Sequence, residues 1–219
     1  MTWTVKVGNE TTSAIHDPGQ GNVVIDTVFV CAHGAGGNMN DGGMQKMAKA
    51  LVSKGVNLVR FNFLYKEKKS GRPDAMPKLQ DCFAAVVDKT RDELNPTKLI
   101  IGGRSMGGRA ASMMAADGYD CDGLLLYAYP LHPAGQPEKL RDAHLPRIKV
   151  PVLCFNGTRD ALCTPELMEE ALKTVTTAWT MQWIEGADHS FHVLKSSGRT
   201  DAEVMSDIAD TSSTWLAAV

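Results

Sequence analysis

A serine between two glycines is the first candidate for chemistry in this sequence. Residues 103–107, Gly-Arg-Ser-Met-Gly, directly follow an apolar run at 99–102 and precede a segment of small residues that is typical of a helix. The glycines leave room for a tight strand-to-helix turn, which would lift the serine hydroxyl above the edge of a sheet. Ser105 is therefore predicted to be a nucleophile. A glycine-rich turn that only packs a helix on a strand would explain the same pattern without chemistry.

A serine hydroxyl is a weak nucleophile until a base removes its proton, so this turn predicts an acid and then a histidine later in the chain. Asp160 lies just after an apolar run at 152–156, and His189 lies just after another at 180–184. We predict His189 as the base and Asp160 as the acid that orients it. Asp188 is a rival for the acid, but adjacent side chains tend to point apart. The other histidines are expected to have structural or binding roles: His16, His33, His132, His144 and His192.

Attack on a carbonyl group creates an oxyanion, which needs preorganised N–H donors. The residue after the nucleophile supplies one donor, so we predict the Met106 N–H. The second is predicted to be the Ala35 N–H, because residues 33–37, His-Gly-Ala-Gly-Gly, end a predicted strand with glycines that let the backbone close on a ligand. His33 would then brace this loop.

The same glycines raise the alternative of a dinucleotide site, which also begins with a strand, Gly-x-Gly and a helix. With glycines at 34 and 36, the third position of that pattern falls on Met39, and no acidic residue ends the next apolar run at 56–63. Residues 102–109 likewise lack the Gly-Lys-Ser/Thr ending of a phosphate-binding loop. The sequence therefore predicts no cofactor.

Four residues are predicted as substrate contacts: Gly34, Tyr65, Arg104 and His132. Tyr65 and His132 are chosen only from their placement near strand ends, and Arg104 because its charge could attract an acidic substrate. Residues 130–149 form a polar connection that is too short to be a separate lid domain, so the site is expected to be fairly open. An open site favours a small acyl substrate.

The elements that must position these residues follow from the alternation of apolar runs with segments of helical periodicity. This alternation predicts an α/β fold, a three-layer α/β/α sandwich with a mostly parallel sheet and helices on both faces. The strands are expected at 28–33, 56–63, 99–102, 123–128, 152–156 and 180–184, with an N-terminal hairpin of 2–7 and 11–16 at the edge of the sheet. Helices are expected around 44–52 and 79–87, from Pro165, and from Thr200 near the C-terminus, with loops at 66–74 and 130–149.

Length and composition favour one globular domain spanning residues 1–219. The formal net charge is -2 and no long basic stretch is present, so nucleic acid and anionic lipid are not expected partners. No export signal or membrane-spanning run is readable. The five cysteines have no paired spacing, which favours reduced thiols and a cytoplasmic location over disulfides or a metal site: Cys31, Cys82, Cys121, Cys154 and Cys163.

With these residues in place, the chain resembles the α/β-hydrolase superfamily, and within it a compact branch akin to dienelactone hydrolases and the testis-expressed hydrolase-like proteins. The resemblance covers nearly the whole chain from Val28 onward. Beyond the general motifs, the stretches that carry it are 60–63, 103–109, 129–133, 157–160 and 188–191. It implies an α/β-hydrolase fold with a minimal lid. Dienelactone hydrolases use a cysteine where this chain has Ser105, so their lactone substrate is not carried over.

Two functions remain open at this point. The first is a serine hydrolase that cleaves a small acyl ester or thioester through an acyl-enzyme on Ser105, His189 and Asp160. The second is a non-catalytic interaction module that keeps the fold as a scaffold, because some proteins similar to this branch serve as subunits of larger assemblies. The oligomeric state is left open by the sequence.

Overall fold

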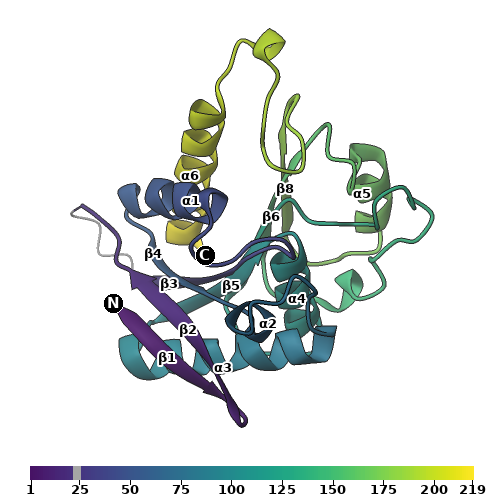
Figure 1. Ribbon diagram of the computed structural model, residues 1–219. Coiled ribbons are helices and arrows are strands. Elements are labelled where there is room, and N and C mark those ends of the chain that lie inside the picture. The colour runs from purple at the N-terminus through teal and green to yellow at the C-terminus, as the bar shows by residue number, and fades with distance from the viewer. Residues whose placement is uncertain (22–25) are drawn as a thin grey trace.

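One eight-stranded sheet forms the centre of the computed structural model, which describes residues 1–21 and 26–219 (Figure 1). The strand order is β1-β2-β4-β3-β5-β6-β7-β8. The strands are β1 (Thr2–Val7), β2 (Glu10–Asp17), β3 (Thr27–Ala32), β4 (Asn57–Phe61), β5 (Lys98–Arg104), β6 (Gly123–Tyr127), β7 (Val152–Gly157) and β8 (Trp179–Ile184). Strands β3 to β8 run parallel, whereas β2 is antiparallel to both β1 and β4. The predicted mostly parallel sheet and its edge hairpin are confirmed.

The burial of the strands explains their sequences. Every residue of β3, β6 and β7 is buried, as expected for strands covered on both faces. At one edge of the sheet, β1 alternates between exposed and buried residues over most of its length. At the other edge, β8 is only partly buried along most of its length.

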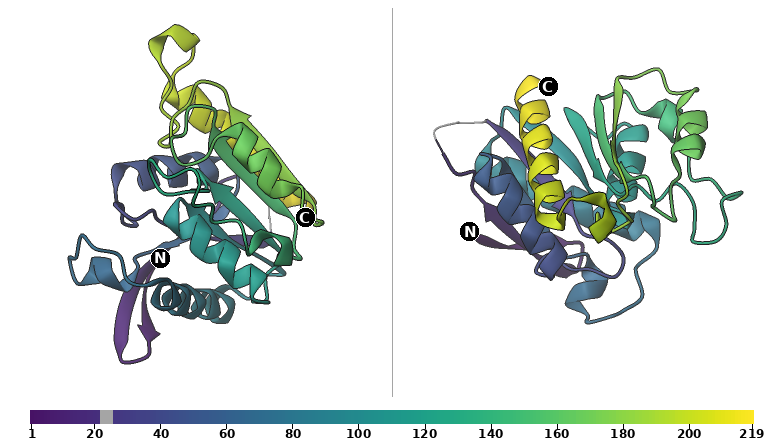
Figure 2. Two further views of the ribbon diagram at one scale, coloured as in Figure 1. Left: turned by 90° about the vertical axis from the view of Figure 1, so that its right-hand side faces the viewer. Right: turned by 90° about the horizontal axis from the view of Figure 1, so that it is seen from above.

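Helices cover both faces of the sheet, which confirms the three-layer α/β/α architecture (Figures 1 and 2). They are α1 (Gly42–Ser53), α2 (Leu64–Glu67), α3 (Met76–Leu94), α4 (Met106–Ala116), α5 (Pro165–Leu172) and α6 (Asp201–Ala218). Helices α1 and α6 share one apolar core with the sheet. Helices α3, α4 and α5 contribute to a second core on the opposite face.

Two helices begin where the sequence predicts that they begin. Thr164 accepts a hydrogen bond from Leu167 N at the start of α5, and Pro165 occupies its first turn. Thr200 and Glu203 form a reciprocal capping box at the start of α6. These caps satisfy N–H groups that have no acceptor within the helix.

Residues 62–67 differ from the prediction. The strand expected at 56–63 ends at Phe61, and the short helix α2 extends into the loop expected at 66–74. The Phe63 N–H leaves the sheet because it donates to His33 Nε2 at 3.1 Å. Glu67 then accepts hydrogen bonds from Asn62 Nδ2 and Ser13 N, both at 3.0 Å. A single helical turn is marginal alone, so these tertiary contacts stabilise it.

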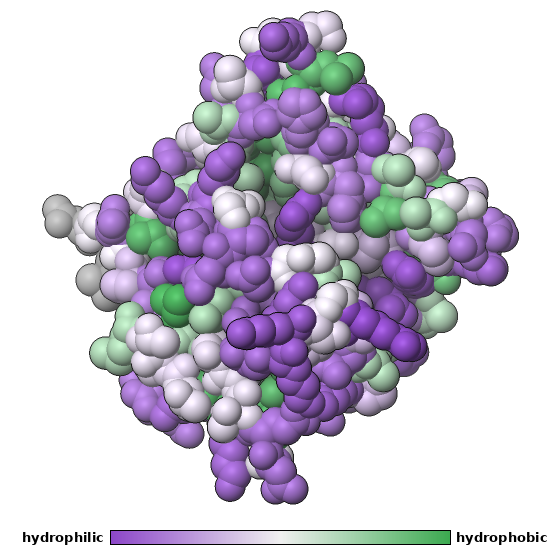
Figure 3. Space-filling view, viewed as in Figure 1, coloured by the Kyte–Doolittle hydropathy of each residue, from purple (hydrophilic) through white to green (hydrophobic). Residues whose placement is uncertain are grey.

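The surface facing the viewer in Figure 3 is mostly hydrophilic, with small apolar areas. None of the helices in the described ranges is long and apolar enough to cross a membrane. All five cysteines lie in the described part of the chain, where each is buried with a free thiol. Residues 130–149 contain one short 3-10 turn, Leu145–Arg147, and pack Leu145 and Ile148 into the protein.

Candidate active site

Ser105 lies on the tight turn between β5 and α4. Its backbone angles are φ 52° and ψ -117°, a conformation that non-glycine residues rarely adopt and that costs roughly 1–3 kcal/mol. Its N–H donates to Tyr127 O at 2.9 Å, which ties the turn to β6. Ser105 is partly exposed and directly follows the carboxyl end of β5.

The turn also requires glycine at position 103. Gly103 has φ 138°, and a Cβ there would lie 2.2 Å from Ala32 O on β3. Because that oxygen is backbone, it has no room to move away. The first glycine of the Gly-x-Ser-x-Gly pattern therefore lets β5 and β3 approach at the point where the chain turns.

His189 joins Ser105 to Asp160 through its two ring nitrogens. Nε2 lies 2.9 Å from Ser105 Oγ, and Nδ1 lies 2.8 Å from Asp160 Oδ2. The Asp160 side chain is fully buried, whereas that of His189 is 27% exposed. Asp160 is acceptor-only when ionised, so it fixes the proton on Nδ1 and leaves Nε2 to accept from the serine hydroxyl. This is the hydrogen-bond chain of a general base and its nucleophile.

Two further groups hold the buried Asp160 carboxylate. Asn156 Nδ2 donates to Oδ2 at 3.2 Å, and the Leu162 N–H donates to Oδ1 at 2.8 Å. Asn156 is itself fully buried, accepts from Tyr129 N at 3.0 Å and donates to Tyr129 O at 3.1 Å. The role of Asn156 was not predicted from the sequence, in which this residue is only the end of an expected strand. A polar residue at the end of an otherwise apolar buried strand was the available signal.

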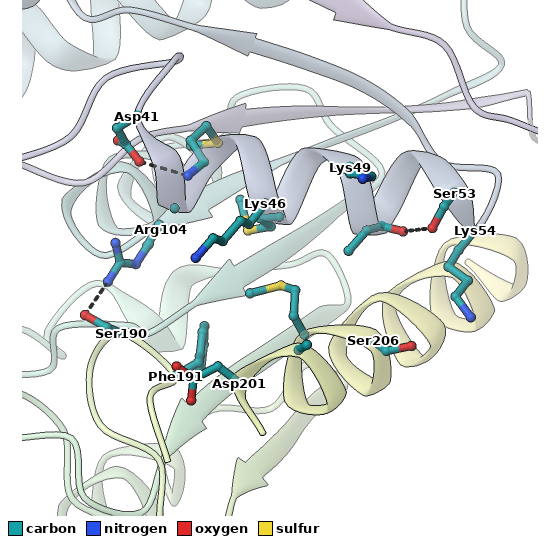
Figure 4. Close-up of a pocket in the computed structure, with 16 residues that line it drawn as sticks. Asp41, Lys46, Lys49, Ser53, Lys54, Arg104, Ser190, Phe191, Asp201 and Ser206 are labelled. Atoms are coloured by element: carbon teal, nitrogen blue, oxygen red, sulfur yellow. Dashed lines mark hydrogen bonds between the residues drawn. The ribbon is translucent and has the colours of Figure 1, made fainter. Parts of the chain in front are cut away.

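The loop that carries His189 is fixed from two sides. Arg104 Nη2 donates to His189 O at 3.0 Å and to Ser190 Oγ at 3.2 Å, and the second of these bonds is drawn in Figure 4. Asp188 Oδ1 accepts from Ser190 N at 2.7 Å and from His192 N at 3.1 Å. Asp188 therefore shapes the loop, and Asp160 is the acid that contacts the imidazole.

The end of β7 and the His189 loop touch at Gly157. A Cβ on Gly157 would lie 2.1 Å from Ala187 O. Arg159 N donates to that same oxygen at 2.9 Å. Asp160 and His189, which are 29 positions apart in the sequence, meet because glycine lets these two backbones come together.

The glycine loop after β3 lies beside the nucleophile. A Cβ on Gly34 would come within 3.5 Å of Ser105 Cβ. His33 Nδ1 lies 2.7 Å from Gly34 O, and because Nε2 accepts from Phe63 N, Nδ1 is the donor in that pair. Burial lowers the pKa of His33 to about 4, which keeps the ring neutral. Tyr65 OH donates to Ala35 O at 2.8 Å.

These contacts hold the Gly34 and Ala35 carbonyl groups and do not use the Ala35 N–H. Among the described residues, neither the Ala35 N–H nor the Met106 N–H has a hydrogen-bond acceptor. Met106 is the first residue of α4, where N–H groups lack partners within the helix. Two unpaired donors on segments next to Ser105 are what an oxyanion site requires.

The residues predicted as substrate contacts have different environments. Gly34 borders Ser105, and Arg104 binds the His189 loop. Tyr65 and His132 are buried, with 1% and 3% exposure. His132 Nδ1 lies 2.9 Å from Pro133 O. Their role in substrate binding stays a prediction.

The remaining histidines lie outside the Ser105–His189–Asp160 hydrogen-bond chain. His144 Nε2 is 2.8 Å from Ser112 Oγ, and burial lowers the pKa of His144 to about 4. His16 stacks on Trp3 in the N-terminal hairpin. His192 pairs with Asp201 at the start of α6, and this hydrogen bond raises the pKa of His192. Within residues 1–21 and 26–219, no group of three His, Cys, Asp or Glu side chains is arranged to hold a metal ion.

Comparisons with known proteins give one consistent result. A family model described as an alpha/beta hydrolase domain matches residues 25–217. An alpha-beta serine hydrolase homologue from Coxiella burnetii has a similar structure, with 22% identity, a TM-score of 0.77 and coverage of 96% of both chains. A serine hydrolase without a lid from Xanthomonas campestris is 22% identical with a TM-score of 0.76, over 98% of this chain and 94% of that one.

A dienelactone hydrolase from Anabaena variabilis is also similar. It is 20% identical, with a TM-score of 0.75 over 98% of this chain and 95% of that one. At these identities the solved structures establish a shared fold.

Proposed function

The chain belongs to the alpha/beta hydrolase domain family, and on that premise we propose that it is a serine hydrolase of small acyl esters or thioesters. Ser105 is the nucleophile, His189 the base and Asp160 the acid that orients it. The observation that carries the proposal is the unbroken hydrogen-bond chain from Ser105 Oγ through His189 to Asp160, at 2.9 and 2.8 Å.

The reaction follows from these contacts. His189 Nε2 takes the Ser105 proton as Oγ attacks the carbonyl carbon, and the imidazolium is stabilised by Asp160. The Ala35 and Met106 N–H groups bind the oxyanion. His189 then returns the proton to the leaving alcohol or thiol, and an acyl-enzyme forms on Ser105. Water attacks this ester by the same proton transfers in reverse, which releases the acid.

Small acyl groups are the substrate class that the surroundings of the site support. Residues 130–149 pack against the body of the protein through Leu145 and Ile148, which argues against a separate lid domain. The similar structure from Xanthomonas campestris is described as lacking a lid. We also propose that residues 1–219 act as one hydrolase domain, because one sheet extends from Thr2 to Ile184.

The test is hydrolysis of p-nitrophenyl esters and matched thioesters of increasing acyl length. Ser105→Ala is expected to lower kcat by about 10⁴-fold or more, with the fold retained by circular dichroism. Ser196→Ala is the matched control, because it removes the hydroxyl of an exposed serine in the short turn Lys195–Ser197. This variant should keep full activity.

Labelling with a fluorophosphonate probe separates the two candidate functions. Wild type should be labelled at Ser105, and Ser105→Ala should not. Equal activity in wild type and Ser105→Ala would refute Ser105 as the nucleophile. Absence of both labelling and hydrolysis would favour a non-catalytic interaction module.

A further inference from the structure

A groove with a volume of about 700 Å³ lies between α1 and α6 (Figure 4). Both helices line it, and Arg104, Ser190 and Phe191 close the end nearest the His189 loop. Ser105, Asp160 and His189 are not among its lining residues. Its volume is in the range of small-molecule binding sites. The groove is therefore a cavity beside the proposed active site and separate from the reacting groups.

The inner surface of the groove is apolar and adaptable. Met44 and Met47 from α1, Met205 from α6 and Phe191 contribute large apolar side chains. Met44, Met47 and Phe191 are only 3 to 4% exposed and form the floor of the groove, so the partly exposed Met205 is the lining methionine most accessible to a ligand. Methionine side chains are unbranched and flexible, so such a surface can fit an aliphatic chain without demanding one shape.

The rim of the groove is basic. Four basic and two acidic side chains line it, which gives two net positive charges in a protein whose overall charge is -2. Both acidic groups are already engaged. Asp41 caps α1 by accepting from Met44 N and also accepts from Asn38 N, and Asp201 pairs with His192.

Lys46 and Lys49 are available to a ligand, and Arg104 is available in part. Its Nη2 donates to His189 O and Ser190 Oγ, whereas its Nε and Nη1 donate to no group in the described ranges. Lys54 pairs with Asp210 at 2.6 Å. Within the described ranges, Lys46, Lys49 and Arg104 have no carboxylate within 4 Å. Figure 4 shows Lys46 directed from α1 into the space between the helices, on the same side as Arg104.

We propose that the groove between α1 and α6 binds an aliphatic carboxylate, with its chain against the methionines and its carboxylate between Lys46 and Arg104. Apolar contacts favour the chain, and the Lys46 ammonium together with the free Nε and Nη1 of Arg104 favours the negative headgroup. A cationic amphiphile would meet like charges, and a neutral one would leave the basic rim unpaired. The inference goes beyond the proposed hydrolysis, and its test measures binding without any turnover.

The test is displacement of a fluorescent probe, 1-anilinonaphthalene-8-sulfonate, from the full chain by decanoate, decanol and decylammonium. Decanoate should displace the probe at lower concentration than either of the others. Lys46→Gln should weaken decanoate binding about two- to fivefold, the effect of one exposed charge, and leave decanol binding unchanged. Lys6→Gln, which removes an exposed charge from the N-terminal hairpin, is the matched control and should change neither.

A second variant blocks the groove sterically. Ala202→Trp places a large side chain on the exposed lining of α6 and should weaken both decanoate and decanol at least tenfold, with thermal stability retained. Equal displacement by decanoate and decanol, or unchanged binding in both groove variants, would overturn the proposal. Sedimentation that shows a dimer which Ala202→Trp converts to monomer would also overturn it, because a second copy would then occupy the groove.

Discussion

Asn156→Asp is the sharpest test of how the buried acid is held. The substitution keeps the size of the side chain and the oxygen that accepts from Tyr129 N. It replaces the amide nitrogen, which donates to Asp160 Oδ2 at 3.2 Å and to Tyr129 O at 3.1 Å, with a second carboxyl oxygen. Two carboxylates then share one fully buried site. The new carboxyl stays protonated in the folded protein well above its ordinary pKa.

The size of the effect follows from linkage. Burial and a neighbouring carboxylate raise the pKa of such a group by about 3 units above the value of about 3.9 in an unfolded chain. At pH values between the pKa in the unfolded chain and the pKa in the folded protein, the folded protein holds a proton that the unfolded chain has lost. The free energy of unfolding therefore falls as pH rises through this range. At 1.36 kcal/mol per unit, Asn156→Asp should lose roughly 4 kcal/mol between pH 4 and pH 7 relative to wild type. Below pH 4 the variant should be about 1 kcal/mol less stable than wild type, because its protonated carboxyl donates one hydrogen bond where the amide of Asn156 donates two.

The assay is urea unfolding followed by tryptophan fluorescence at several pH values between 4.5 and 8. Asn62→Asp is a matched control, since Asn62 also accepts from a backbone N–H and donates to a carboxylate, Glu67, at 3.0 Å. That pair is exposed to solvent, so the control should change by less than about 1 kcal/mol over the same range. A flat difference between Asn156→Asp and wild type would refute the inference that Asn156 donates to the buried carboxyl group of Asp160.

Two further predictions follow from the geometry. Gly157→Ala places a Cβ 2.1 Å from Ala187 O and should lower kcat about 100-fold by shifting the His189 loop, whereas Gly71→Ala, where a Cβ meets nothing within 4 Å, should not. Burial lowers the pKa of His33 and His144 to about 4, so only the unfolded chain gains their protons as pH falls from 6.5 to 4. Each of these two histidines should lower the free energy of unfolding by roughly 3 kcal/mol as pH falls from 6.5 to 4. Urea unfolding of His144→Gln should therefore depend less on pH than that of wild type.

The architecture was predictable because the strands are buried on both faces. Runs such as those at 28–33 and 152–156 are apolar without alternation, and the segments between them have helical periodicity. A parallel sheet brings the carboxyl ends of its strands to one edge. For that reason Ser105, Asp160 and His189 were expected close together although they are far apart in the sequence.

The roles of the supporting residues were not predictable, because they depend on tertiary contacts. A polar Asn156 at the end of an apolar strand indicates that its side chain needs a partner, but not which partner it has. Nothing local shows that Asn156 binds the acid or that Arg104 binds the backbone of the His189 loop. The same holds for α2, a single turn whose position depends on Glu67 and Tyr65 reaching segments far away in the sequence. Sequence patterns indicate which side chains can react, and packing decides which ones hold them in place.

The position of β8 has a consequence for how the protein loses activity. This strand forms the edge of the sheet, is only partly buried and leads directly into the loop that holds His189. Edge segments with little burial open by local fluctuation at a lower free energy than the centre of a fold, and their amide hydrogens exchange earlier. Detachment of β8 alone would take the proposed base away from Ser105 while β3, β5 and β6 stayed intact. Inactivation by mild denaturant would then precede the cooperative transition, and the reaction rate would report on one strand of the sheet.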